Sequence, residues 1–88
     1  MHNSKTLPIP DDCQVNPDAF QLMAIWIAEN EPRISFRSDA WEDPAIWGIV
    51  LADVVRLVAQ QYQESTGQSI DNTVSRIVSG FRAELETT

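Results

Sequence analysis

The segment DPAIWGIVLADVVRLVAQQYQ, residues 43–63, decides the fold class, because it is the most apolar continuous stretch of the chain and its pattern is typical of one long helix. Asp43 is suited to cap this helix, since its carboxylate can accept a free backbone N–H of the first turn. Pro44 follows with a φ already set for a helix and with no N–H to leave unpaired. The sequence therefore predicts that the helix begins at this pair.

The apolar side chains of this helix cover about half of its circumference, which is a wider face than the stripe of an ordinary surface helix. They are Ile46, Trp47, Val50, Leu51, Val54, Leu57, Val58 and Tyr62. Beside them, Gly48, Ala52 and Ala59 form a strip of small residues where another backbone is expected to approach closely. A face this wide needs cover from two directions, and we expect the rest of the chain to provide one layer and a second copy to provide the other.

A β-hairpin is predicted upstream of the long helix. Residues 33–37 alternate polar and apolar side chains, which is the pattern of a strand. Residues 23–28 fit either a strand or the end of a preceding helix. Because a strand at 33–37 needs a neighbour, the hairpin is favoured, with residues 29–32 as its turn.

The ends of the chain complete the predicted α+β order of short helix, hairpin, long central helix and C-terminal amphipathic helix. Asn16–Pro17 predicts the start of the short helix, which leaves residues 1–15 as an extended arm and 16–88 as a single domain. The arm either lies along the core or is a frayed tail. Gly67 is suited to end the long helix, and Ser69 or Asp71 to cap the last one.

Composition excludes several partners. The net charge of −7 disfavours nucleic acid and anionic membranes, which attract clustered Lys and Arg. Cys13 is the only cysteine, so no internal disulfide and no cysteine-based metal site is expected, and His2 alone is not expected to be a ligand. No segment has the pattern of a signal peptide or a membrane span, so a cytoplasmic protein without cofactors is predicted.

Four side chains are the candidates for contact with a ligand or partner: Trp26, Arg33, Arg37 and Trp41. Tryptophans gather in pockets and at the centres of interfaces, although they equally fill the cores of small domains. The two arginines share one face of the predicted strand and are suited to an acidic ligand, although pairing with Glu29, Glu31 or Asp39 is the simpler interpretation. No acid–His–nucleophile or metal-binding set is predicted, because the chain has a single histidine. Asp39, Glu42 and Asp43 around Trp41 could act as acid and base, although carboxylates at a helix start are the simpler interpretation.

Several motifs resemble those of a family of short uncharacterised proteobacterial proteins that is classed as a domain of unknown function. The resemblance covers nearly the whole chain and rests on Leu7–Pro10, Trp26–Ala28, Arg33–Arg37, Asp39–Gly48 and Gly80–Glu84. The segment Asp39–Gly48, with the pattern D-x-W-E-D-P-x-x-W-G, is the most specific of these. The resemblance implies a complete protein and supplies no activity.

Self-association is the sharpest functional prediction. A two-stranded hairpin is marginal on its own, and joining the hairpins of two copies would give a four-stranded sheet in a homodimer. These features favour a small non-enzymatic homodimeric protein-interaction module. The alternative is a small-ligand-binding protein with a Trp-lined pocket and an Arg anion contact.

Overall fold

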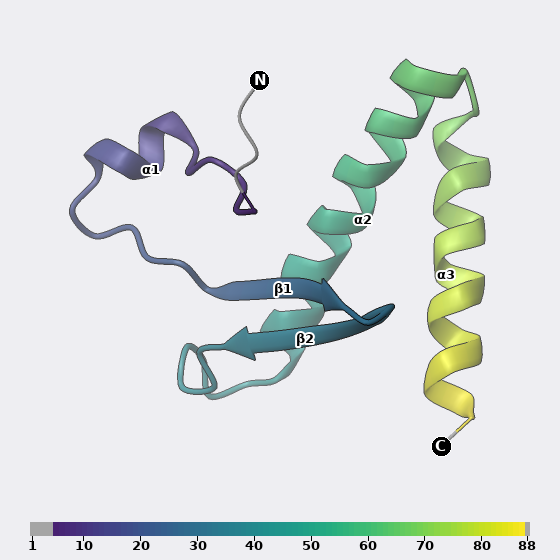
Figure 1. Cartoon of the computed structure of the whole chain (residues 1–88). Helices are drawn as coiled ribbons and strands as arrows, with labels where there is room; N and C mark the ends of the chain where they lie inside the picture. Colours follow the sequence, from purple (N-terminus) through teal and green to yellow (C-terminus); the bar gives the residue numbers. More distant parts are fainter. Residues whose placement is uncertain (1–4, 88) are drawn as a thin grey trace. The chain divides into compact units, whose positions relative to one another are not determined.

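The computed structural model describes residues 5–87, and the chain divides into two compact units, Met1–Ala40 and Trp41–Thr88 (Figure 1). His2 and the rest of residues 1–4, together with residue 88, lie outside the described residues. The first unit contains the helix α1 (Asp11–Val15) and the strands β1 (Met23–Ala28) and β2 (Glu31–Phe36), and the second contains the helices α2 (Ala45–Thr66) and α3 (Ile70–Glu86). The predicted α+β class is confirmed, and the single domain over 16–88 stays a prediction.

The short helix lies before the position predicted for it. The structure places α1 at Asp11–Val15, inside the segment expected to be an extended arm, and residues 16–22 carry no helix. The Asn16 side chain accepts the backbone N–H of Asp18 at 2.9 Å, and the N–H of Ala19 donates to the Asn16 carbonyl at 3.1 Å. Asn16–Pro17 therefore starts a tight turn, because the same side-chain bond that caps a helix also closes a turn when no helix follows.

Residues 23–28 form a strand, which resolves the ambiguity between strand and helix. β1 pairs antiparallel with β2, with Ile25 opposite Ile34 and Ala28 opposite Glu31. The two turn residues Glu29 and Asn30 have φ of 55° and 64°. Two positive φ values in a two-residue loop are typical of the type I′ turn, whose twist matches that of the paired strands.

The two faces of the hairpin differ in polarity, because successive side chains of a strand point to opposite sides. One face, named the apolar face here, carries Met23, Ile25, Ile27, Pro32, Ile34 and Phe36. The other face carries Trp26, Arg33 and small or polar neighbours. Ile25 on the apolar face is 59% exposed and Ile27 is 69% exposed, so these two side chains are not buried in a core.

The C-terminal end of α2 forms as predicted, whereas its start lies one residue later than predicted, with Pro44 at the N-cap and Ala45 as the first helical residue. The Asp43 carboxylate, just before Pro44, accepts the N–H of Ala45 at 3.0 Å. At the other end, Gly67 adopts the left-handed conformation, with φ of 80°, and its N–H donates to the Gln63 carbonyl at 2.9 Å. These local bonds satisfy groups that the helix itself leaves unpaired.

The helices α2 and α3 pack against each other as an antiparallel pair (Figure 1). Ser69 caps α3, since its hydroxyl accepts the N–H of Asn72 at 3.1 Å. Among residues 5–87, only Ala59 of α2 and Thr73 of α3 are buried. The strip of small residues predicted on α2 thus receives α3 at Ala59, whereas a Cβ built on Gly48 would meet nothing within 4 Å.

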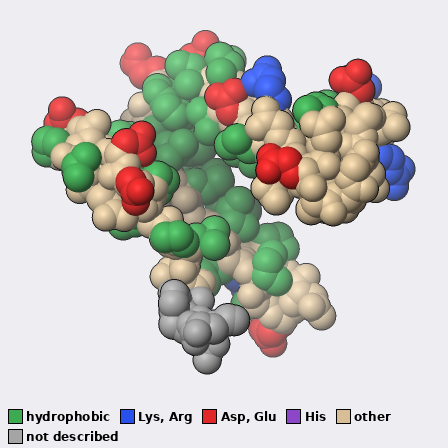
Figure 2. Space-filling view, turned by 90° about the horizontal axis from the view of Figure 1, so that it is seen from above, with side chains coloured by type: hydrophobic (Ala, Val, Ile, Leu, Met, Phe, Trp, Pro, Cys, Tyr) green, Lys and Arg blue, Asp and Glu red, His purple; other side chains and the backbone are tan. Residues whose placement is uncertain are grey.

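Much of the predicted apolar face of α2 remains exposed. Leu57 is 65% exposed, and Val54, Val58 and Tyr62 are also exposed. Figure 2 shows extensive hydrophobic surface in the view it draws, with charged side chains scattered around it. None of the described helices is long and apolar enough to cross a membrane.

Replacing Gly67 with alanine is expected to lower the free energy of unfolding by about 1 kcal/mol, because a Cβ is disfavoured in the left-handed conformation. Gly80→Ala is the matched control, and it is expected to change the free energy of unfolding in the opposite direction. Gly80 lies inside α3 with no atom near its missing Cβ, so alanine there should raise the free energy of unfolding by about 1 kcal/mol. Chemical denaturation of both variants measures the difference, and equal effects would contradict the assigned helix ends.

Candidate functional site

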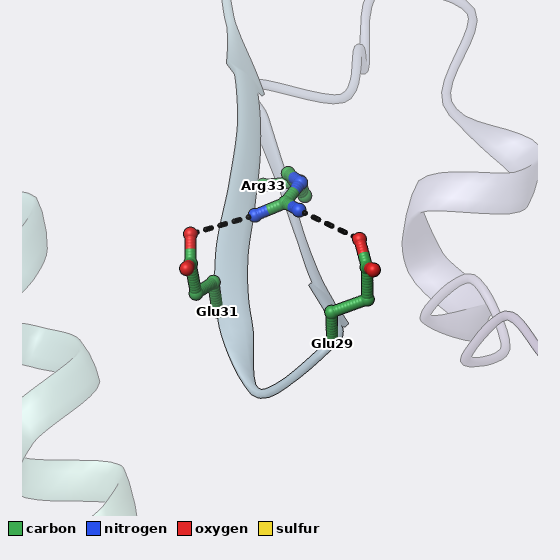
Figure 3. A network of polar contacts seen from close by, with 3 residues as sticks. All are labelled: Glu29, Glu31 and Arg33. Carbon is green, nitrogen blue, oxygen red and sulfur yellow. Dashed lines mark hydrogen bonds and ion pairs between the residues drawn. The ribbon is translucent and has the colours of Figure 1, made fainter.

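Arg33 is held between two carboxylates at the turn of the hairpin (Figure 3). Its Nη1 lies 3.2 Å from Oε1 of Glu31, and its Nη2 lies 3.4 Å from Oε1 of Glu29. All three side chains are exposed, so the pairs are screened by solvent and contribute little to stability. Arg33 therefore pairs with neighbouring acidic side chains, which was the simpler of its two interpretations.

Arg37 is tied to the segment that precedes β1. Its Nε donates to the Gln21 carbonyl at 2.8 Å, and its guanidinium lies over the Phe20 ring, 5.2 Å from the centroid. This is the geometry of a cation–π contact. Arg37 also lines a shallow hollow of about 190 Å³ with residues 21–24, Ser35 and Phe36.

Trp26 lines a larger pocket that lies wholly in the first unit and has a volume of about 490 Å³. Part of its wall is formed by residues 23–26 of β1, and another part by residues 5–10. Cys13, Ala19, Phe20 and Gln21 complete the lining. The lining is mostly apolar, and its volume falls within the range of about 300–1,000 Å³ of small-molecule sites.

Residues 5–10 belong to the N-terminal arm, which was expected either to lie along the core or to be a frayed tail. Leu7 is 90% exposed, so this segment is not packed into a core, yet it lines the pocket beside β1. Neither the arm nor Phe20 was among the predicted site residues. The alternation of Leu7, Pro8, Ile9 and Pro10 was the available signal, because prolines keep a segment extended and apolar side chains seek a surface.

Trp41 belongs to the second unit, where its ring packs edge-on against Trp47. The centroids are 5.4 Å apart and the rings are inclined by 80°, which is a favourable aromatic arrangement. Both rings are partly exposed. The contact explains how the segment before α2 is anchored to the first turns of that helix.

The structure thus brings three of the four predicted site residues, Trp26, Arg33 and Arg37, into one small unit, and only Trp26 lines the larger pocket. Within residues 5–87, no group of three or more His, Cys, Asp or Glu side chains is arranged to hold a metal ion. The assignment of these residues to a ligand or partner stays a prediction.

The fold and these features define a small α+β protein built from a β-hairpin unit and a helical-pair unit. The chain belongs to the family described as a domain of unknown function (DUF5076), which matches residues 6–88. The membership in a domain of unknown function that the motifs indicated is confirmed. The specific D-x-W-E-D-P-x-x-W-G pattern and the proteobacterial range of the family stay predictions.

One similar solved structure is described as that of a "putative pyruvate dehydrogenase from the photosynthetic bacterium Rhodopseudomonas palustrus CGA009". It is 33% identical to this chain, with a TM-score of 0.77, and the match covers 97% of this chain and 86% of that one. A search of curated proteins gave no match.

Proposed function

We propose that this chain is a non-enzymatic interaction module that works as a homodimer. The observation that carries the proposal is the state of the hairpin: among residues 5–87 it is a sheet of two strands, and its apolar face is exposed. A two-stranded sheet is marginally stable by itself, and three or more strands or a packed helix are needed for independent stability. A second copy supplies the missing strands.

The helical unit supports the same proposal. Val54, Leu57 and Val58 of α2 stay exposed although α3 packs against the same helix. A helical layer against one face of a sheet is a standard way to bury two such surfaces together. A four-stranded sheet made by two hairpins would present a broad apolar face for the helices to cover.

The free thiol of Cys13 fits a location in the cytoplasm, where cysteines stay reduced. The net charge of −7 supports a protein partner over nucleic acid.

The alternative function, binding of a small molecule, is favoured by one observation, the pocket of about 490 Å³ beside Trp26. Its lining lacks Arg33 and Arg37, so an apolar ligand would suit it better than the anion expected from the sequence. A thermal-shift screen of metabolites separates the two functions, because a ligand that binds only the folded state raises the melting temperature.

Sedimentation velocity at chain concentrations between about 1 and 100 μM tests the proposed dimer. The range lies above a dissociation constant of about 1 μM, which corresponds to a binding free energy of about 8 kcal/mol. We expect one species of twice the mass of the 9.9 kDa chain. A single species of 9.9 kDa across this range would overturn the proposal.

A further inference from the structure

The hydrogen bonds of the hairpin identify which backbone groups point outward. The N–H of Arg37 donates to the Leu22 carbonyl at 3.0 Å, so these two residues, which continue the register, face each other as a hydrogen-bonded pair. Bonded and non-bonded pairs alternate along antiparallel strands. The backbone groups that point away from the hairpin therefore belong to Met23, Ile25 and Ile27 on β1 and to Pro32, Ile34 and Phe36 on β2.

The two outer edges differ in their capacity to pair with another strand. Pro32 occupies an outward position of β2 and has no N–H, so that edge lacks a donor where a neighbouring strand would need one. Prolines at such positions are a common protection against pairing at a sheet edge. All three outward positions of β1 carry both an N–H and a carbonyl, so this edge is complete.

The pocket of about 490 Å³ lies beside β1. Four consecutive residues, Met23 to Trp26, line the 490 Å³ pocket together, although their side chains point alternately to the two faces. A pocket lined in this way lies along the edge of the strand. Residues 5–10 line the same pocket. Among residues 5–87, the backbone bonds outside the helices and the hairpin ladder include none to Met23, Ile25 or Ile27.

Charge also favours β1. Its sequence MAIWIA has no ionisable side chain, whereas β2 carries Glu31 and Arg33. Two copies of a chain with net charge −7 meet at lower electrostatic cost through an uncharged strand.

We propose that β1 pairs antiparallel with β1 of a second copy, across a two-fold axis at Ile25, in the strand order β2–β1–β1–β2. This inference rests on the proposed homodimer and specifies its surface and register. Ile25 lies opposite Ile25 of the second copy, and Met23 lies opposite Ile27. Every outward N–H and carbonyl of β1 then has a partner, since each of these pairs exchanges two hydrogen bonds.

This register also joins the apolar faces of the two hairpins. Directly opposite residues of antiparallel strands project to the same side of a sheet, so Met23, Ile25 and Ile27 of both copies share one face. The result is a continuous apolar surface four strands wide, of the kind that a layer of helices covers.

Disulfide trapping tests the register. In the full chain with Cys13→Ser, the variant Ile25→Cys should form a covalent dimer under mild oxidation, because Cα atoms of such a pair are about 5.5 Å apart and a disulfide accepts this distance. Ile27→Cys is the matched control. In the proposed register its two copies are offset by about 14 Å along the strands and should not cross-link.

A mixture of Met23→Cys and Ile27→Cys chains should cross-link to each other, which keeps the test decisive should Ile25→Cys fail to fold. Cross-linking through Ile34→Cys in place of Ile25→Cys would show pairing through β2 and overturn the inference. Sedimentation of the same reduced variants separates the two proposals. Dimers that cross-link at neither Ile25→Cys nor the mixed pair overturn the β1 register alone, whereas monomers overturn the homodimer with it.

Discussion

Replacing Ala59 with leucine is expected to lower the free energy of unfolding by about 2 kcal/mol, because added methyl groups in a closely packed contact force the neighbouring helices apart. Ala59 is 0% exposed and is the buried apolar residue of the helical pair among the described residues. For a chain of this size, the change corresponds to a fall in melting temperature of about 10 °C. Differential scanning calorimetry measures it.

Ala83→Leu is the matched control for this prediction. It makes the same chemical change on α3 at an exposed position, and alanine and leucine have similar helix propensity. The control should change the free energy of unfolding by no more than about 0.5 kcal/mol. Equal effects of the two variants would mean that the approach of α3 to Ala59 does not limit the size of the side chain there.

Replacing Leu57 with glutamate is expected to weaken self-association by about 100-fold or more, because a carboxylate in an apolar interface loses its hydration without gaining a partner. Leu57 belongs to the exposed apolar face of α2 and is 65% exposed. The proposed dimer covers this face. Sedimentation velocity should find the variant as a monomer at concentrations where the unmodified chain is a dimer.

Gln60→Glu is the control for added charge. It lies on the polar side of the same helix, it is exposed, and it also adds one negative charge to a chain of net charge −7. We expect this variant to remain a dimer. If Leu57→Glu also remained a dimer, the apolar face of α2 would be exposed to solvent in the dimer. The covering layer proposed for that face would then be wrong.

The elements with strong local signals could be predicted from the sequence. Asp43, Gly67 and Ser69 each make the cap bond expected of them, because a cap joins groups within a few residues and needs no distant contact. The alternation at residues 33–37 indicated β2, although the strand spans Glu31–Phe36 and so includes two residues that were predicted to be part of the turn.

The position of α1 could not be predicted in this way. Asn16–Pro17 has the residues of a helix start, yet the same Asx bond serves a turn, and only the residues that follow decide between the two. The helix α1 has five residues, too short for apolar periodicity to reveal it. Its start at Pro10 and Asp11 fits the general preference for proline and acids in a first turn.

Part of the candidate site could be predicted from the sequence, and part could not. The sequence named Trp26 and the acidic partners of Arg33, because neighbouring positions on one strand face are set by its two-residue period. It did not name the wall of residues 5–10 or Phe20, because a pocket between segments far apart in the chain depends on how they pack.

The sequence by itself determined the caps at Gly67 and Ser69, the hairpin and the surplus of apolar surface on α2, since these follow from propensities and periodicities within one element. The tertiary structure alone decided which residues α3 buries, where the pocket lies, and which backbone groups of β1 and β2 point outward. The physical reason is that register and packing join residues distant in sequence. A shift of one residue in register would leave every local signal intact and exchange the inward and outward groups of both strands.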